Sequence, residues 1–406
     1  MNIARRSFAL TREAEEYLQD LADELAVPES RYEAAERSYK SLGEWLHREA
    51  SSVCRFDPQV YVQGSFRLGT TIKPLNEAED YDVDSVCELR NLTKADLTQQ
   101  QLKDMLGVEV EAYRRAQSML NPMREGRRCW ILDYADGAQF HMDIVPSLPN
   151  ALGQRLLLEA RGFDARWAST AIVITDNKHP YYQVPSDEWP RSNPKGYADW
   201  FKSRMAGIFE KRRRQIAEGV RASVEDIPDY RVRTPLQTAV MILKRHRDHT
   251  FEGRPEVRPI SVVLTTLAAH AYNGEETIGP ALVSILARMD QYVVHDGRKY
   301  VIPNPTDPLE NFADKWAEHP ERADAFFEWL ERARAEFGAA AVLVERQSIA
   351  DTVAKGVGRG PAERARARRR TGASLLRTAS AAPAASSTAF AFPNERRAST
   401  KPQGFA

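Results

Sequence analysis

This sequence contains few cysteines, has no formal net charge and lacks long hydrophobic runs. Its 406 residues include three cysteines, Cys54, Cys87 and Cys129, which are dispersed and form no Cys-x-x-Cys metal site. Such usage fits a reducing cytoplasm rather than a disulfide framework. Lys and Arg together number 57, as do Asp and Glu, so the formal net charge is zero. We therefore expect no global electrostatic attraction to nucleic acid or to a membrane.

Segments that would target or anchor the chain are also lacking. No run approaches the roughly 18 continuous apolar residues of a membrane-spanning helix, and residues 1–6 are not followed by the apolar core of a signal peptide. These features predict a cytoplasmic protein without a membrane partner. The length predicts two or three domains, and the hydrophobic content of 42% is that of an ordinary globular protein.

A possible phosphate-binding turn follows the first clear strand. The apolar run Val60–Val62 predicts a strand that stops at Gly64 and Ser65. Gly64 allows the backbone to approach a ligand closely, and Ser65 can cap a following turn or short helix. Backbone N–H groups at a turn of this kind, with a helix start behind them, form a phosphate site.

Two carboxylates come next on a second predicted strand. Asp82 and Asp84 flank a valine and lead into an apolar stretch, whereas Asp80 belongs to the preceding loop. Positions i and i+2 of a strand share a face, so both carboxylates point the same way. Two carboxylates and a phosphate-binding turn are the parts needed to hold Mg²⁺ against a triphosphate.

A third carboxylate lies on a predicted hairpin. Cys129–Tyr134 reads as a strand, the Asp136-Gly137 pair signals the turn, and Gln139–Val145 forms the return strand. Alternation places Asp143, together with His141, on the more polar face of this return strand. That is where a metal ligand would lie.

These segments together resemble a known enzyme family. QGSFRLGTTIKP, DYDVDSVCEL and FHMDIVPSLP are similar to the signature of the DNA polymerase β-like nucleotidyltransferases. In their fuller context they resemble the bacterial cGAS/DncV-like nucleotidyltransferases (CD-NTases), which make cyclic di- or trinucleotide signals in anti-phage CBASS systems. The resemblance covers roughly residues 53–338. It implies an α+β fold, in which a mixed nucleotidyltransferase sheet with flanking helices joins a helical lobe and nucleotides bind in the cleft between them.

The resemblance also implies roles for individual residues. Asp82, Asp84 and Asp143 would be catalytic and would hold two Mg²⁺ ions, with nucleoside triphosphates, ATP among them, as substrates. A lysine at the position of Lys244 would neutralise triphosphate charge. The full set of implied nucleotide contacts is Gln63, Gly64, Ser65, Arg67, Lys244, Ser261, Asn304 and Asp307.

Four segments are expected along the chain. They are N-terminal bracing helices over 1–52, a nucleotidyltransferase core over 53–200, a helical lobe over 201–350, and a basic, then disordered, tail over 351–406. Helix starts are predicted at Thr93, at the capping box Ser30–Glu33 and at the pair Thr234-Pro235. His246 and His249, at positions i and i+3 of a predicted helix, are interpreted as lying on a solvated face rather than as binding a metal.

The end of the chain suggests a protein partner. Some CD-NTases end in an aromatic residue followed by Ala or Gly, and a ubiquitin-conjugation-like partner joins their C-terminal carboxylate to a target. The terminal pair Phe405-Ala406 resembles that ending. A downstream effector would respond to the cyclic product. Two alternatives stay open: a nucleotidyltransferase that modifies RNA ends or a protein hydroxyl, and a non-catalytic toxin–antitoxin partner that has kept the fold.

Overall fold

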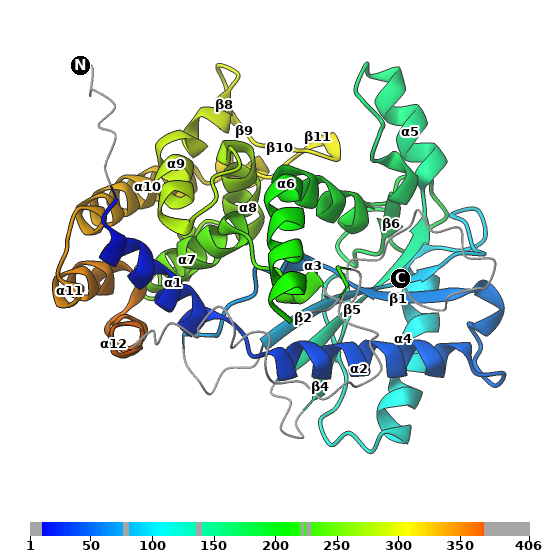
Figure 1. Cartoon of the computed structure of the whole chain (residues 1–406). Helices are drawn as coiled ribbons and strands as arrows, with labels where there is room; N and C mark the ends of the chain where they lie inside the picture. Colours follow the sequence, from blue (N-terminus) through cyan, green and yellow to red (C-terminus); the bar gives the residue numbers. More distant parts are fainter. Residues whose placement is uncertain (1–9, 76–80, 135–139, 221–222, 225–228, 369–406) are drawn as a thin grey trace. The chain divides into compact units, whose positions relative to one another are not determined.

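The computed structural model describes residues 10–75, 81–134, 140–220, 223–224 and 229–368 (Figure 1). These residues form two compact units. The first, here called the sheet unit, comprises the described residues of 27–69 and 76–200. The second, the helical unit, comprises the described residues of 1–26, 70–75 and 201–368.

A seven-stranded mixed sheet forms the centre of the sheet unit. Its strands are β1 (Pro58–Val62), β2 (Tyr81–Leu89), β3 (Arg124–Glu125), β4 (Trp130–Tyr134), β5 (Phe140–Pro149), β6 (Ile172–Ile174) and β7 (Arg191–Ser192). The main order is β1-β2-β5-β4-β3, with β6 paired to β5 and β7 to β6. Only the β2–β5 pair is parallel among the described strands. The predicted α+β class with a mixed sheet is confirmed.

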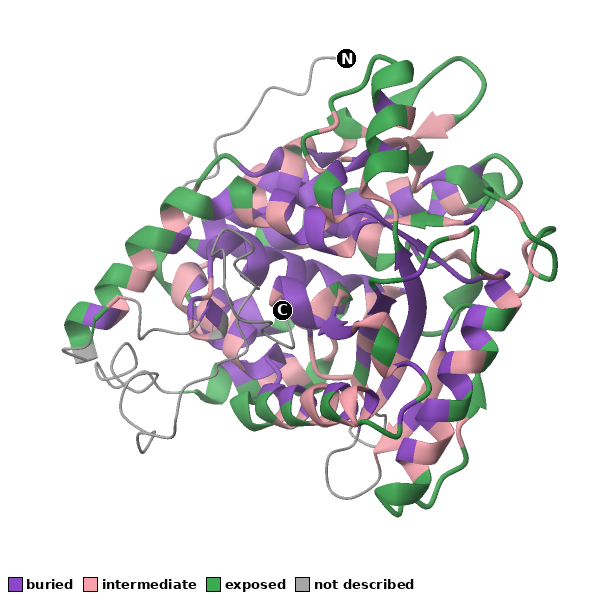
Figure 2. Ribbon diagram, turned by 90° about the vertical axis from the view of Figure 1, so that its right-hand side faces the viewer, coloured by how far each residue is buried: buried purple, intermediate pink, exposed green. Residues whose placement is uncertain are grey.

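Four helices accompany this sheet. They are α2 (Glu29–His47), α3 (Gly64–Leu68), α4 (Gln99–Ala116) and α5 (Ala151–Ala160). Helix α4 covers the face of the sheet from which Trp130 projects, because Gly107 of α4 lies against the Trp130 ring and the indole N–H donates to the Lys103 carbonyl at 2.8 Å. Figure 2 shows that the strands are mostly buried, while the helices carry exposed outer faces. The opposite face of β4 and β5 is the one that carries Asp143.

Two predicted helix starts in this unit are wrong. Helix α4 begins after Thr98, whose side chain and Gln101 form a complete capping box. The predicted cap, Thr93, instead donates its backbone N–H and its hydroxyl to the Asp96 carboxylate, which closes a local turn. Helix α2 begins directly after Pro28 without a side-chain cap, so the capping box predicted at 30–33 is absent.

The helical unit contains most of the remaining helices. They are α1 (Arg12–Leu25), α7 (Pro235–Thr250), α8 (Ser261–Ala271), α9 (Ile278–Arg288), α10 (Pro320–Ala341), α11 (Arg346–Val357) and α12 (Arg359–Ala367), together with most of α6 (Pro194–Val220). Two short hairpins join β8 (Val294–His295) to β9 (Tyr300–Val301) and β10 (Pro303–Asn304) to β11 (Asp307–Asn311). Among the described residues, no helix is both long and apolar enough to cross a membrane.

Helix α7 is the buried centre of this unit. It starts as predicted, with Thr234 as N-cap, Pro235 in the first turn and a capping box completed by Gln237. Because α1, α8, α9, α10 and α11 pack around it, every residue from 235 to 247 is buried. The solvated face predicted for His246 and His249 is therefore wrong for His246, whereas His249 is half-buried. His246 is fully buried and lies 3.1 Å from the Glu336 carboxylate of α10.

The helical unit also extends beyond the predicted boundary at residue 350. Helices α11 and α12 continue the fold to residue 367 and pack against α1. Arg346 pairs with the buried Asp20, and Arg364 Nε lies 2.6 Å from Glu24 Oε1. Basic residues that suggested the start of a tail are thus partners for acidic groups on α1. Residues 369–406, including the predicted conjugation site at Ala406, lie outside the described residues.

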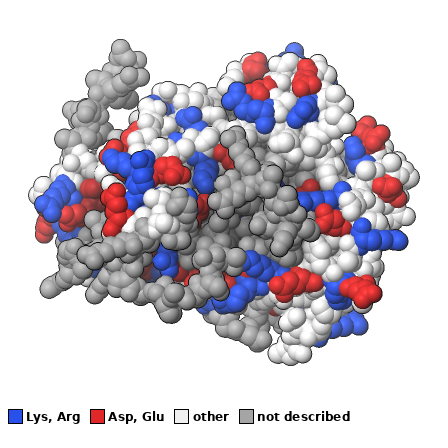
Figure 3. All heavy atoms as spheres, turned by 45° about the vertical axis from the view of Figure 1, so that its right-hand side comes forward, with Lys and Arg blue, Asp and Glu red and all other residues white. Residues whose placement is uncertain are grey.

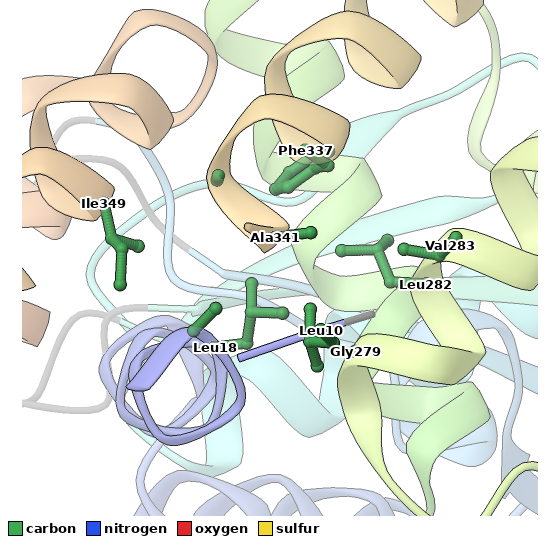
Figure 4. A pocket seen from close by; sticks show the side chains of 10 residues that line it. Leu10, Leu18, Gly279, Leu282, Val283, Phe337, Ala341 and Ile349 are labelled. Carbon is green, nitrogen blue, oxygen red and sulfur yellow. The ribbon is translucent and has the colours of Figure 1, made fainter. Parts of the chain in front are cut away.

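A small void in the helical unit is a packing defect rather than a ligand site. It has a volume of about 10 Å³, and its wall is apolar, with Leu18, Leu282 and Phe337 among the lining side chains (Figure 4). Ligand pockets are usually several hundred Å³ in volume and carry a few polar groups. Nothing of nucleotide size fits here.

Candidate active site

Four polar side chains project from one face of two adjacent strands. Strands β2 and β5 run parallel, and their register pairs Asp82 with His141 and Asp84 with Asp143. Directly paired residues share a face of a sheet, and residues two apart on a strand share it too. The residues between them are buried in the core. The alternation inferred from the sequence is therefore present, and it places the three predicted carboxylates on one face of the sheet.

A potential metal-binding cluster lies on this face. Asp82, His141 and Asp143 each offer one ligand atom, and these atoms all lie within 4.8 Å of one another. His141 Nε2 and Asp82 Oδ1 are 3.5 Å apart. Sequence reasoning predicted the two carboxylates but not His141, although its alternation placed His141 on the Asp143 face. That shared face was the signal for a fourth member of the site.

The surroundings of Asp143 suit a bound cation. Its Oδ2 accepts a hydrogen bond from the Cys129 thiol at 3.4 Å, and its backbone carbonyl accepts one from the Ser85 hydroxyl at 3.0 Å. Its Oδ1 is buried and has no hydrogen-bond partner among the described residues. A buried, unpaired carboxylate oxygen is costly unless a cation or another donor meets it. Carboxylate oxygens are also the ligands that Mg²⁺ and Mn²⁺ favour, so the donor set fits a divalent cation.

The pKa shifts in this cluster also favour a bound cation. Partial desolvation, and then the charge of Asp143, raise the pKa of Asp82, while His141 opposes the rise. Burial and the same Asp143 charge raise the pKa of the Cys129 thiol to about 12, so this thiol stays protonated and remains a donor. The cluster thus concentrates negative charge that a divalent cation would relieve.

Asp84 contacts the predicted phosphate turn. Gly64 has a φ of +61°, and a Cβ atom at this position would overlap the Asp84 carboxylate. The backbone N–H of Gln63 donates to the Asp84 carbonyl at 2.8 Å. Only glycine satisfies both the left-handed backbone and this close approach. The turn and the Asp84 carboxylate are therefore held at a fixed distance from each other.

The other residues of the turn differ in exposure. Gly64 is exposed, Gln63 and Ser65 are half-buried, and Gln63 is the N-cap residue of α3. Arg67 is only 2% exposed, and desolvation raises the pKa of the half-buried Tyr39 while the charge of Arg67 opposes this rise. The exposed side of the turn is thus formed by the residues at the start of α3, with Arg67 behind them. A contact between Arg67 and a nucleotide stays a prediction.

Lys244 and Ser261 belong to the helical unit. Lys244 is buried, and its ammonium donates to the Thr70 carbonyl at 3.1 Å and lies 3.3 Å from the Thr70 hydroxyl. Ser261 is the first residue of α8, and its hydroxyl accepts from the buried guanidinium of Arg247 at 2.9 Å. Both side chains hold neighbouring segments in place, and their contacts with triphosphate stay predictions.

Asn304 and Asp307 fix the short hairpin of β10 and β11. The Asn304 carboxamide accepts from the backbone of Thr306 at 2.9 Å and donates to the Glu310 carboxylate at 2.7 Å. Asp307 accepts from the backbone of Leu309 at 3.3 Å. Both residues are buried, so their visible role is to shape this loop.

Surface charge is mixed where it can be seen. The face shown in Figure 3 carries acidic and basic side chains close to one another rather than a single basic field. This distribution agrees with the formal net charge of zero.

Comparison with known proteins assigns this site to a family. Residues 58–146 match the model of the "Cyclic GMP-AMP synthase DncV-like, nucleotidyltransferase domain". The chain carries a DncV-like nucleotidyltransferase domain. The matched segment begins at the first residue of β1 and ends within β5, so it contains the Gly64 turn and all three predicted carboxylates. The resemblance inferred from the sequence is confirmed.

Two curated relatives are similar to this chain over most of their length. A c-di-GMP synthase of Roseivirga ehrenbergii is 27% identical over 318 residues, which is 78% of this chain and 76% of the relative. The cyclic dinucleotide synthase CdnG of Bradyrhizobium diazoefficiens is 26% identical over 318 residues, which is 74% of this chain and 70% of the relative.

Solved structures share the fold. The Bradyrhizobium diazoefficiens CD-NTase CdnG, solved in complex with GTP, matches with a TM-score of 0.66 at 21% identity, over 87% of this chain and 98% of that one. The E. coli MS115-1 CdnC, solved in a HORMA-deltaN complex, matches with a TM-score of 0.55 at 16% identity, over 85% and 96% of the two chains. The chain therefore shares the fold of these two CD-NTase structures.

Proposed function

We propose that this protein is a divalent-cation-dependent nucleotidyltransferase that joins nucleoside triphosphates into a cyclic oligonucleotide signal for anti-phage defence. The observation that carries the proposal is that Asp82, Asp84 and Asp143 lie on one face of β2 and β5, with Asp84 beside the Gly64 turn. This arrangement lies inside the DncV-like domain. Both curated relatives are named as synthases of cyclic dinucleotides, which supports the same reaction class here.

The position of each carboxylate suggests which cation it would hold. Asp82 and the unpartnered Oδ1 of Asp143 would hold a cation between β2 and β5, whereas Asp84 would do so next to the Gly64 turn. When bound, Mg²⁺ ions supply Lewis acidity that activates a ribose hydroxyl and stabilises the pyrophosphate leaving group. Two such ions are the number that the family resemblance implies. Most of the rate then comes from positioning and charge stabilisation.

The turn would bind the phosphates. Gly64 is exposed and has no side chain, so a triphosphate can approach the backbone at the start of α3 next to Asp84. Gln63 and Ser65 flank this approach. We propose that Lys244 and Ser261 contact the donor triphosphate and that the loop of Asn304 and Asp307 lines the base pocket, as the resemblance implies.

GTP is the substrate that the comparisons favour. One curated relative is a c-di-GMP synthase, and the CdnG structure was determined with GTP. We therefore propose GTP as a substrate and a dinucleotide as the ring size. Use of ATP, inferred from the family resemblance, stays a prediction.

A partner and a location complete the proposal. The three cysteines are free thiols, which supports a reducing cytoplasm as the place where the protein works. Conjugation through Ala406 concerns residues outside the described ones, and it stays a prediction from the sequence. The HORMA complex of CdnC supports the general idea that proteins of this fold act with protein partners.

The proposal is tested by incubating the purified protein with radiolabelled GTP, alone and with the other triphosphates, in the presence of Mg²⁺ or Mn²⁺. Phosphatase treatment then removes the terminal phosphates of unreacted GTP and of linear products, which changes their chromatographic mobility, whereas a cyclic product carries none and is unchanged. A phosphatase-resistant product supports the proposal. Labelled RNA or protein with no free product would favour the alternative nucleotidyltransferase, and no reaction under any condition would favour the non-catalytic partner.

A further inference from the structure

His141 lies beside the carboxylates of the candidate active site, but their proposed roles do not account for it. Its ring is on β5, directly opposite Asp82 of β2, and is about one third exposed, with 30% of its side-chain surface accessible. One of its ring nitrogens belongs to a group of ligand atoms, with one from Asp82 and one from Asp143, that all lie within 4.8 Å of one another. Nothing in the proposed reaction so far uses an imidazole at this position.

The spacing of His141 suits a metal ligand better than a hydrogen bond. Its Nε2 lies 3.5 Å from Asp82 Oδ1, beyond the roughly 2.7–3.2 Å of an N–H···O hydrogen bond. In an octahedral shell with bonds of about 2.1 Å, neighbouring ligand atoms lie about 3.0 Å apart and opposite ones about 4.2 Å apart. The observed 3.5 Å falls between these two values, so a small side-chain adjustment would give one shared ion.

The backbone provides a second argument. His141 and Asp143 are separated by one buried residue on β5, and Asp82 is fixed opposite His141 by the parallel register. The three side chains therefore start from adjacent points of a rigid sheet rather than from loops. Ligands on such elements meet an ion with little loss of conformational entropy.

We propose that His141 Nε2 is a direct ligand of the cation held by Asp82 and Asp143, and that it makes this site prefer Mn²⁺ to Mg²⁺. The inference rests on the proposed function, because it concerns the cation of the same reaction. Mg²⁺ is bound through oxygen atoms and keeps much of its water, whereas imidazole nitrogen is a better ligand for first-row transition ions. One nitrogen beside two carboxylates shifts selectivity toward Mn²⁺ without excluding Mg²⁺.

A different role for His141 would be that of a counter-charge to Asp82. In that case the ring would pair with the carboxylate in the metal-free protein and would move away when a cation binds. The two roles make opposite predictions about whether nitrogen is bonded to the ion, and the test below separates them directly.

The test is pulsed EPR on the full-length protein, freed of any histidine tag and loaded with one equivalent of Mn²⁺. Electron spin-echo envelope modulation detects a directly bonded ¹⁴N nucleus, and EPR titration of free Mn²⁺ gives the dissociation constant. The variant is His141→Gln. The matched control is His319→Gln, because His319 is an exposed histidine in the helical unit that also lies beside a carboxylate, Glu321, at 3.2 Å.

We expect ¹⁴N modulation in the wild type and in His319→Gln, and its loss in His141→Gln. The Mn²⁺ dissociation constant of His141→Gln should rise by about tenfold or more, with a much smaller change for Mg²⁺ measured by competition. Absence of ¹⁴N modulation in the wild type, or its persistence in His141→Gln, would overturn the assignment. These readouts need no turnover. If the protein shows ¹⁴N modulation but forms no cyclic product, the assignment of His141 as a ligand holds and the proposed function is wrong.

Discussion

Asp84 of β2 and Asp143 of β5 are directly paired residues on two parallel, neighbouring strands, although helix α4 and a hairpin separate them in the sequence. Parallel pairing needs a long crossover connection, which these intervening elements supply. The two carboxylates are consequently positioned by the sheet itself. Their separation does not depend on a loop conformation, which is what a metal site with narrow geometric tolerance requires.

Replacement of Asp84 by Asn should abolish synthesis while leaving the fold intact. The substitution keeps the shape next to Gly64 but removes a ligand charge, so product formation should fall by about 10²-fold or more. The control is Asp187→Asn, since the Asp187 side chain is 96% exposed and pairs only loosely with Lys94 at 3.8 Å. Product yield and thermal unfolding are measured for both variants. Near-wild-type synthesis by Asp84→Asn would mean that the carboxylate assignment is wrong.

Substitution of Gly64 by Ala should damage both stability and activity. Alanine at a φ of +61° costs about 1–2 kcal/mol in backbone strain, and the added Cβ displaces the Asp84 carboxylate. Gly162→Ala is the matched control, because Gly162 has a φ of +74° but no atom within 4 Å of the added Cβ. Both variants should lose unfolding free energy in denaturant titrations. Only Gly64→Ala should also lose synthesis. Equal activity of the two variants would show that the close approach of Gly64 to Asp84 does not matter for synthesis.

Lys244→Met should raise the KM for nucleoside triphosphate more than it lowers kcat, if the ammonium contacts the triphosphate equally in the ground and transition states. The Thr70 carbonyl would also lose its buried donor, which should cost about 1–3 kcal/mol of unfolding free energy. Lys211→Met, which removes an exposed lysine paired with Glu276 at 2.7 Å, is the control. Loss of stability with unchanged triphosphate kinetics would leave Lys244 a purely structural role.

The raised pKa of Asp82 predicts a pH dependence in the metal-free protein. Between the ordinary pKa of an aspartate and the raised value, the folded state binds more protons than the unfolded state. The unfolding free energy should therefore fall as pH rises through this window. Asp82→Asn should show a flatter profile when thermal unfolding is followed against pH in EDTA. Parallel profiles for the two proteins would contradict the assigned shift.

Strand alternation explains why the core of the site could be predicted from the sequence. A period of two residues determines which side chains of one strand share a face, so the sequence alone groups Asp82 with Asp84, and the family resemblance added Asp143. The same rule placed His141 with Asp143. Its closeness to Asp82, however, depends on the parallel register of β2 and β5, and the sequence carries no direct signal for that register.

Other features depended on tertiary context. Thr93 and Thr98 are both good N-cap residues. Thr93 is hydrogen-bonded to the nearby Asp96, and Thr98 is the residue that caps α4. The polar end of α7 looked solvated because its sequence is basic, yet surrounding helices bury His246. Likewise, Arg364 suggested a tail, whereas it pairs with Glu24 of α1. For His246 and Arg364 the partner lies far away in the sequence, outside the local window that a sequence pattern can assess.

The most direct test of the central claim is mass spectrometry of the phosphatase-resistant product made from GTP and a divalent cation. A cyclic dinucleotide has the mass of two nucleoside monophosphates less two waters, and it carries no terminal phosphate that phosphatase can remove. We predict this species with wild-type protein and its absence with Asp84→Asn and with Asp143→Asn. Detection of only linear, phosphatase-sensitive products, or of equal cyclic product from the two variants, would contradict the account.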